Sequence, residues 1–144
     1  MKTFISGSRS IAKLPENAIN LIKQLLSTTD VFVGDCNGLD SLVMSIFDTL
    51  ANDVKPLNIF FTANNSVIAP RNTPKLNPYV LHPVMCNDAT KVFSRDWYSL
   101  KDITMSEQCT HGVVFIQNNS PGSVANYHRL IQFKKHVRAF NIVK

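Results

Sequence analysis

The stretch Thr3-Phe4-Ile5-Ser6-Gly7-Ser8-Arg9-Ser10 leads from a short apolar run into a glycine turn, and a helical pattern follows it. Two later loops repeat this arrangement, Gly34-Asp35-Cys36-Asn37-Gly38 and Ser120-Pro121-Gly122-Ser123. In an open parallel sheet every strand-to-helix turn falls on the same carboxyl edge, so the three loops can converge on one ligand. Backbone N–H groups and helix amino termini at that edge attract anions. The repeated arrangement therefore predicts a site for a nucleotide phosphate.

Apolar runs alternate with helical patterns along the rest of the chain. We expect strands at residues 3–5, 31–33, 57–62, 113–116 and 137–142. Helical patterns begin behind Pro15, near Asp40, at residue 89 and after Ser123, and the pattern over residues 89–108 is interrupted. This alternation predicts an α/β protein, a Rossmann-like three-layer α/β/α fold with a mainly parallel sheet of about five strands.

Residues 64–83 are rich in Asn and Pro and show no period. Clusters of these residues between periodic segments are typical of loops. We interpret this segment as a long loop that could cover a ligand.

Length and composition limit the class of protein. The chain has 144 residues, of which 44% are hydrophobic and 17% charged, and this predicts one compact domain over residues 1–144. The stretch from Met1 to Gly7 lacks a long apolar run and enters a glycine turn. We therefore expect neither a signal peptide nor a membrane span, and a cytoplasmic location.

The number and spacing of the cysteines indicate reduced thiols rather than disulfide bonds. Cys36, Cys86 and Cys109 form no CxxC pair and leave an odd number, which fits a cytosolic protein better than a disulfide framework. His82 and Cys86 have a possible ligand spacing, but no second pair accompanies them. We expect no metal site and no bound cofactor.

The charge balance favours anionic partners. The formal net charge is +5 and the pI is near 9.3. The carboxyl-terminal stretch contains Arg129, Lys134, Lys135, Arg138 and Lys144. Such a balance suits a nucleotide and a polynucleotide equally. A solvated helix face is the alternative interpretation.

The first loop has groups that suit a phosphate. Gly7 permits a sharp turn, and Ser8, Arg9 and Ser10 add two hydroxyls and a guanidinium at its mouth. A structural turn with an exposed arginine is the alternative, because the motif lacks the full spacing of a dinucleotide fingerprint.

The other two loops have comparable groups. Asp35 is placed to reach ribose hydroxyls or to order its loop, whereas for Asp40 alone we favour a helix cap. Gly122 and Ser123 are expected at the amino end of a helix, where unsatisfied N–H groups favour a phosphate. Ser123 as an ordinary helix cap is the alternative interpretation, and the two roles are compatible. Further polar groups are Arg71, Asn72, Tyr98, Lys101 and Asp102. An ordinary surface position explains each of these residues as well as a functional role does.

Four motifs in this order resemble the SLOG superfamily, named for the DprA/Smf DNA-processing proteins and the Lonely Guy phosphoribohydrolases. The motifs are Gly-Ser-Arg-Ser-Ile, Gly-Asp-x-Asn-Gly-x-Asp, Tyr-Ser-x-Lys-Asp-x-x-Met and Ser-Pro-Gly-Ser. The resemblance covers residues 4–142, with residues 64–85 the poorest match, and is closest to small stand-alone bacterial and phage members.

The resemblance implies a Rossmann-like protein that binds a nucleotide or a nucleotide-derived ligand. It also implies a homodimer or larger homo-oligomer. It implies ligand contacts for Gly7, Ser8, Arg9, Gly34, Asp35, Asn37, Gly38, Asp40, Gly122, Ser123 and Asn126, and further contacts for Arg71, Tyr98, Lys101 and Asp102.

One departure from that pattern concerns catalysis. Lonely Guy enzymes use a Pro-Gly-Gly-x-Gly-Thr-x-x-Glu loop, whereas residues 121–126 are Pro-Gly-Ser-Val-Ala-Asn and contain no glutamate. Neutral Asn126 can hydrogen-bond a ribose but cannot stabilise an oxocarbenium-like centre as a carboxylate does. Asp35, Asp40 or Asp102 could supply an acid from another loop.

Four hypotheses about function follow. The first is binding of a phosphate-bearing nucleotide or nucleotide-derived small molecule. The second is an N-glycosidase of nucleoside monophosphates with an aspartate in place of the glutamate. The third is single-stranded nucleic-acid binding, ranked lower because no basic-aromatic stripe is present to stack bases. The last is a structural or interaction protein whose loops are unoccupied.

Overall fold

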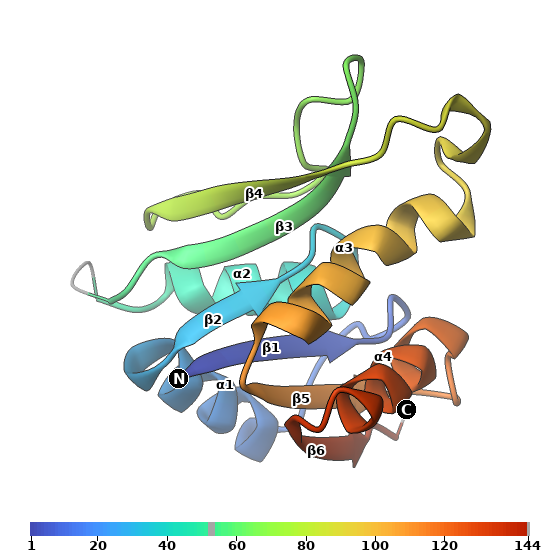
Figure 1. Cartoon of the computed structure of the whole chain (residues 1–144). Helices are drawn as coiled ribbons and strands as arrows, with labels where there is room; N and C mark the ends of the chain where they lie inside the picture. The colour runs from blue at the N-terminus through green and yellow to red at the C-terminus, as the bar shows by residue number, and fades with distance from the viewer. Residues whose placement is uncertain (52–53, 144) are drawn as a thin grey trace.

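The computed structural model, which describes residues 1–51 and 54–143, has three layers built around an all-parallel sheet (Figure 1). Its six strands are β1 (Lys2–Gly7), β2 (Asp30–Val33), β3 (Leu57–Ala63), β4 (Tyr79–Met85), β5 (His111–Ile116) and β6 (His136–Asn141). The helices of the described residues are α1 (Glu16–Thr28), α2 (Leu39–Asp48), the short 3₁₀ helix η1 (Ala89–Lys91), α3 (Arg95–Gln108) and α4 (Pro121–Gln132). The predicted Rossmann-like α/β fold is confirmed, with six strands where about five were expected.

The strand order places a topological switch beside β1. Along the sheet the order is β4-β3-β2-β1-β5-β6, and β1 pairs in parallel with both β2 and β5. From this point the chain builds outward in one direction through β2, β3 and β4, and in the other through β5 and β6. The loops that follow β1 and β5 therefore flank the crevice where ligands bind in open α/β sheets.

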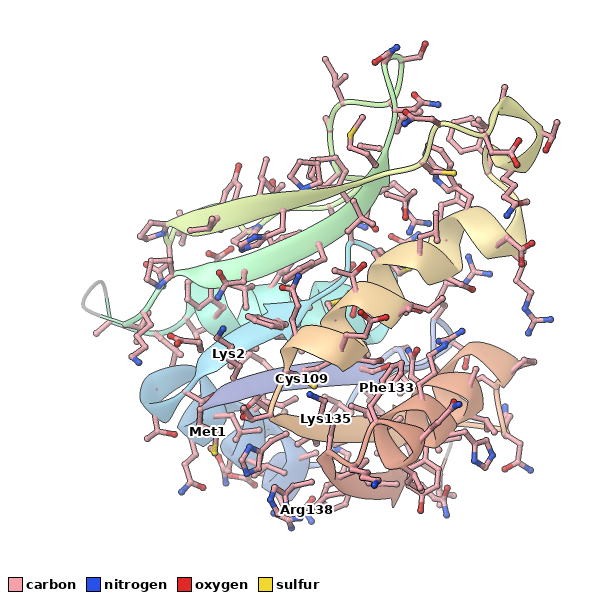
Figure 2. The ribbon with its side chains drawn as sticks, viewed as in Figure 1. Met1, Lys2, Cys109, Phe133, Lys135 and Arg138 are labelled. Carbon is pink, nitrogen blue, oxygen red and sulfur yellow. The ribbon has the colours of Figure 1, made fainter. Side chains whose placement is uncertain are left out.

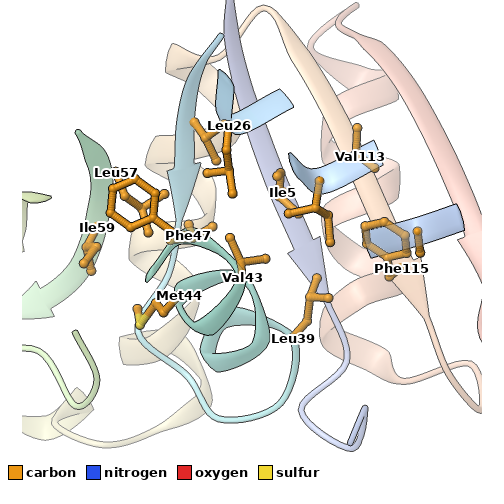
Figure 3. Close-up of a cluster of buried hydrophobic side chains, with 14 of the residues drawn as sticks. Ile5, Leu26, Leu39, Val43, Met44, Phe47, Leu57, Ile59, Val113 and Phe115 are labelled. Carbon is orange, nitrogen blue, oxygen red and sulfur yellow. The ribbon is translucent and has the colours of Figure 1, made fainter. Parts of the chain in front are cut away.

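Alternate residues of the central strands fill two cores. Ile5, Val113 and Phe115 face α1 and α2, and Figure 3 shows them packed with side chains of α2 such as Val43 and Phe47. The neighbouring positions Phe4, Phe32, Phe60 and Val114 face the other way, where Met105 of α3 and Leu130 of α4 cover them. Because both faces are buried, the strands are continuous apolar runs rather than alternating ones.

The interruption expected within residues 89–108 separates η1 from α3. Asp88 caps η1 by accepting a hydrogen bond from Thr90 N, and Ser94 caps α3 by accepting one from Trp97 N. Between the two caps Phe93 adopts a positive φ of 60°, which ends one helical segment before the other begins. This junction and the first turns of α3 lie on the same side of the molecule as the start of α4 (Figure 1).

The prediction that residues 64–83 lack regular structure is wrong for their last part. β4 starts at Tyr79 and pairs in parallel with β3 from Leu57↔Tyr79 to Ala63↔Met85. Pro83 within the strand obscured it in the sequence, but a proline is tolerated at the edge of a sheet. Residues 64–78 replace the usual crossover helix. They are fastened to α2, because the Asp48 carboxylate accepts from the backbone N–H groups of residues 75, 76 and 77 at 2.7, 3.1 and 3.0 Å.

Within the described part of the chain, the helices are too short or too polar to cross a membrane.

Candidate functional site

A cavity of about 750 Å³ opens at the carboxyl edge of the sheet, bounded by the loops after β1, β2 and β5 and by the first half of α3. Small-molecule sites generally have volumes of about 300–1,000 Å³. The lining residues are Phe4, Ser6, Gly7, Ser8, Arg9, Ser10, Gly34, Cys36, Asp40, Phe93, Arg95, Tyr98, Ser99, Lys101, Asp102, Ser120, Pro121, Gly122, Ser123 and Asn126. Residues from all three glycine loops thus meet in one cavity.

Three serine hydroxyls converge at the start of α4. Ser8 Oγ contacts Ser120 Oγ and lies 3.2 Å from Ser123 Oγ, and Ser120 Oγ donates to Ser123 Oγ at 3.0 Å. Gln117 N donates to Ser8 Oγ at 2.9 Å, which fixes the first loop against the third. Ser120 precedes the helix without a side-chain capping bond, so these hydroxyls bond one another instead of the helix amino end. The positive end of α4 and the hydroxyls therefore share one wall of the cavity.

The loops after β1 and β2 touch through their backbones. Gly38 has φ 78°, and a Cβ at this position would lie 2.4 Å from Arg9 O. Leu39 N also donates to Ser8 O at 3.3 Å. Only glycine permits this approach, which sets the position of Arg9 at the cavity wall.

Two guanidinium groups line the cavity without a counter-charge. The side chains of Arg9 and Arg95 make no hydrogen bond or ion pair with another residue in the parts of the chain described, 1–51 and 54–143. Both are exposed. Each can turn toward an anion in the cavity at little cost, since no bond within the protein has to break.

The polar floor of the cavity consists of buried ionisable groups. Lys101 is 2% exposed, and its Nζ donates to Tyr98 O at 2.8 Å and to Asp102 Oδ1 at 3.4 Å. Asp40 Oδ2 accepts from Cys36 N at 3.0 Å. A Cβ on Gly34 would lie 2.8 Å from Asp40 Oδ2 and 3.0 Å from Lys101 Cε, so a glycine is needed for these groups to approach the end of β2.

Burial controls the charge of this floor. It raises the pKa of Asp40 to about 7, because the loss of hydration outweighs the attraction of Lys101. Burial by itself would lower the pKa of Lys101, but the negative charges of Asp102, Cys36 and Asp40 raise it above its ordinary value. Near neutral pH the floor therefore contains a charged lysine and a carboxyl group that still retains much of its proton.

The prediction that Asp40 caps its helix is wrong. The helix starts at Leu39 after Gly38, and no side chain caps it. Asp40 lies inside the first turn, and its carboxylate bonds back to the preceding loop at Cys36. The positive φ of Gly38 starts the helix earlier than the sequence pattern indicated.

Four of the residues predicted to bind a ligand lie outside the cavity lining, namely Asp35, Asn37, Gly38 and Arg71. Arg71 donates to the Asp35 carboxylate through Nη2 at 2.9 Å and Nε at 3.3 Å. Asn72 Nδ2 donates to Asn37 Oδ1 at 3.1 Å. These contacts order the loop after β2, which is one of the two roles expected for Asp35. None of residues 64–83 lines the cavity, although they were expected to cover a ligand.

The remaining predicted residues line the cavity. Among them, Asn126 already forms hydrogen bonds within the protein through both polar atoms of its side-chain amide. Asn126 Nδ2 donates to Ser6 Oγ at 2.8 Å, and its Oδ1 accepts from Arg129 at 2.6 Å. It ties the end of β1 to α4. A ligand that contacts the Asn126 amide would have to share these atoms with Ser6 and Arg129.

Outside the three glycine loops, sequence reasoning missed four lining residues, Phe4, Phe93, Arg95 and Ser99. Arg95 and Ser99 could have been found, because they stand three residues before and one after Tyr98 on one face of a helix. Phe4 and Phe93 gave no such signal, since one resembles a core residue and the other falls in the interrupted region.

Of the basic carboxyl-terminal residues that the structure describes, none lines the cavity. Figure 2 shows Lys2, Cys109 and Lys135 at the opposite, amino-terminal edge of the sheet, and Arg138 projecting from the lower side. There Lys135 Nζ donates to Glu107 O at 2.9 Å. Lys144 lies outside the described residues.

The structure and the comparisons with known proteins assign no metal or family. The described residues contain no group of three or more His, Cys, Asp or Glu placed to hold a metal ion. No protein-family model matches the chain, and neither curated proteins nor solved structures give a match. The resemblance to the SLOG superfamily stays a prediction.

Proposed function

We propose that this protein binds a phosphate-bearing nucleotide or nucleotide-derived ligand in the cavity at the carboxyl edge of its sheet. One observation carries the proposal: residues of three glycine loops line a single cavity with a helix amino end in its wall. Ser8 and Ser123, for example, lie 115 positions apart in the sequence. Such a location at the switch point of a parallel sheet is where anionic ligands bind in this architecture. The resemblance to the SLOG superfamily supports the same function.

The charges of the cavity favour an anion. Its lining contains three basic residues, Arg9, Arg95 and Lys101, and two acidic residues, Asp40 and Asp102. Asp40 keeps part of its proton near neutrality, since burial raises its pKa to about 7. The cavity therefore has a net positive charge, and a phosphate near Ser8 and Ser123 would neutralise it.

Ligand-induced stabilisation is a direct test. We would follow the melting temperature with mononucleotides, NAD and ADP-ribose at millimolar concentration. A ligand at a hundred times its Kd stabilises the fold by about 2.7 kcal/mol, which is a measurable shift. We expect at least one compound to raise the melting temperature. The absence of a shift with every compound would overturn the proposal.

Variants separate this cavity from general attraction to a basic protein. Arg9→Ala and Ser123→Ala should reduce the ligand-induced shift. Arg138→Ala removes the same charge as Arg9→Ala from a residue that does not line the cavity, and it should leave the shift unchanged. Equal losses in Arg9→Ala and Arg138→Ala would indicate nonspecific binding.

A second candidate function is N-glycosidic hydrolysis of a bound nucleotide. It is favoured by the position of Asp40 and Asp102 in the cavity lining and by the raised pKa of Asp40, about 7, which suits a proton donor near neutrality. Free base should then appear on incubation with nucleoside monophosphates. Asp40→Asn or Asp102→Asn should abolish its release, while Asp35→Asn, outside the lining, should not. If no base appears, or if release survives all three changes, this function is wrong.

A further inference from the structure

Phe93 is a large apolar side chain that lines the cavity and remains mostly uncovered. It is 61% exposed and borders the same cavity as Ser8 and Ser123. A single exposed apolar side chain is ordinary on a protein surface, so exposure alone assigns nothing. The backbone of Phe93 and its aromatic neighbours distinguish it.

The backbone holds Phe93 in a conformation that a bulky residue disfavours. Its φ of 60° lies in the left-handed region. Hydrogen bonds that span Phe93 fix the turn, because Lys91 O accepts from Ser94 N at 2.9 Å and from Ser94 Oγ at 2.5 Å. On the carboxyl side, Ser94 Oγ accepts from Trp97 N at 3.2 Å. Such strain persists where surrounding contacts impose it, and it is concentrated at functional sites. Here the strained turn directs an aromatic ring to the cavity.

The ring of Phe93 belongs to a supported aromatic group. Its centroid lies 6.5 Å from that of Tyr98 with the planes 28° apart, and 6.0 Å from that of buried Trp97 in an edge arrangement. Tyr98 also lines the cavity, and the Arg71 guanidinium carbon lies 4.3 Å from the centre of its ring. Asp35 holds Arg71 in turn. The aromatic wall is thus fixed from two sides before any ligand arrives.

The cavity therefore combines two kinds of wall. The start of α4, with Ser8 and Ser123, suits an anion, while Phe93 and Tyr98 present aromatic surface. A flat nucleobase stacks on an aromatic side chain with a gain of about 1–3 kcal/mol in single-stranded nucleic-acid complexes. A sugar phosphate has no such group and would leave this wall bare.

We infer that Phe93, supported by Tyr98, stacks on the base of the bound ligand, so that the ligand is a nucleoside phosphate rather than a sugar phosphate alone. The inference rests on the proposed function and specifies its ligand class. Phe93 then determines preference for the base, whereas the serine cluster and Arg9 bind the phosphate. The two contributions can be measured separately.

The test compares ligands with and without a base on the intact chain. Isothermal titration calorimetry would use AMP, GMP, CMP and UMP beside ribose 5-phosphate. The variants are Phe93→Ala, Phe93→Leu, which keeps an apolar side chain without a π face, and Phe93→Trp, which keeps a π face. Ile68→Ala is the matched control, because Ile68 is 77% exposed and lies outside the cavity lining. Circular dichroism would show that each variant is folded.

We expect the wild type to bind at least one nucleoside monophosphate about tenfold or more tightly than ribose 5-phosphate. Phe93→Ala and Phe93→Leu should lose most of that preference and bind ribose 5-phosphate unchanged. Phe93→Trp and Ile68→Ala should retain it. If only one of the alanine and leucine variants folds, that variant decides the test.

Different failures have different meanings. If the wild type binds nucleoside monophosphates and ribose 5-phosphate equally, or if Phe93→Leu keeps the full preference, the stacking role of Phe93 is wrong while the proposed function stands. If the wild type binds none of the five compounds, and NAD and ADP-ribose also give no melting shift, the proposed function is wrong and the stacking role falls with it.

Discussion

Arg71 forms a two-pronged ion pair with Asp35, with Nη2 2.9 Å from Oδ1 and Nε 3.3 Å from Oδ2. The Asp35 side chain is 6% exposed and that of Arg71 is 36% exposed. The pair connects the segment between β3 and β4 to the loop after β2. Its guanidinium also lies over Tyr98, so one side chain joins this loop to the wall of the cavity.

We predict that Arg71→Ala lowers the free energy of unfolding by about 1–3 kcal/mol, because it leaves a buried carboxylate without its charged partner and with only the backbone N–H of residue 71, which donates to Oδ2 at 2.9 Å. Chemical denaturation of the wild type, Arg71→Ala, Asp35→Asn and the double variant would give the coupling energy. The matched control is Lys55→Ala, which removes the exposed pair with Asp30 at 3.4 Å and should cost less than about 1 kcal/mol. A coupling energy near zero would show that the two residues act independently.

The stability of the fold should depend on pH through Asp40. Burial raises its pKa from 3.8 to about 7, so between these values the native state holds a proton that the unfolded chain has released. The contribution of Asp40 is therefore fully present below about pH 4 and is lost as the pH rises toward 7, at up to about 1.4 kcal/mol for each pH unit.

The measurement is the free energy of unfolding of the wild type minus that of Asp40→Asn from pH 4 to 9. We expect this difference to fall as the pH rises to about 7 and to be flat above it. The amide oxygen of the variant can still accept from Cys36 N, so the loop contact is retained. A difference that increases with pH would mean that Lys101 outweighs burial at this carboxyl group.

Gly38 and Gly122 should respond in opposite ways to alanine. Gly38→Ala would place a Cβ 2.4 Å from Arg9 O at a φ of 78°, so we expect a loss of more than about 1 kcal/mol and weaker ligand binding through displacement of Arg9. At Gly122, in the first turn of α4, a Cβ would meet no atom within 4 Å. Gly122→Ala should be neutral or stabilise the fold by up to about 1 kcal/mol. Thermal melts of the two variants compare them directly, and equal melting temperatures would contradict the proposed contact between the loops.

Thr3 is fully buried in β1, and its Oγ1 lacks a hydrogen-bond partner in the described residues. A buried hydroxyl without a partner costs free energy, so Thr3→Val should raise the free energy of unfolding by about 1 kcal/mol. Thr3→Ser, which keeps the hydroxyl and loses the methyl group, should lower it by about 1 kcal/mol. A valine variant less stable than the wild type would show that the hydroxyl is bonded.

The order of elements could be predicted from the sequence because it depends on local spacing. An apolar run such as residues 113–116, followed by a turn and a helical pattern, indicates a buried strand. The glycine turns that follow such strands all lie at the same edge of a parallel sheet. β4 was missed because Pro83 breaks the strand pattern, and only its pairing with β3 makes it a strand.

At the candidate site, the sequence identified candidate residues but not their partners. Asp35 and Asp40 lie five positions apart, and the sequence made both of them candidate ligand contacts. In the structure Asp35 pairs with Arg71, whereas Asp40 lies in the cavity beside Lys101. The partner of each comes from a distant element, the β3–β4 segment for one and α3 for the other. Burial by those elements decides which carboxyl group retains its proton.

The sequence by itself determined the alternation of strands and helices and the edge at which the glycine loops gather, since both follow from backbone preferences over a few residues. Only the tertiary structure decided which of the candidate residues line the cavity, that Phe93 borders it, and that burial raises the pKa of Asp40. Those properties arise from the packing of α3 and α4 over the ends of β1 and β2, and packing between remote segments leaves no local pattern in the chain.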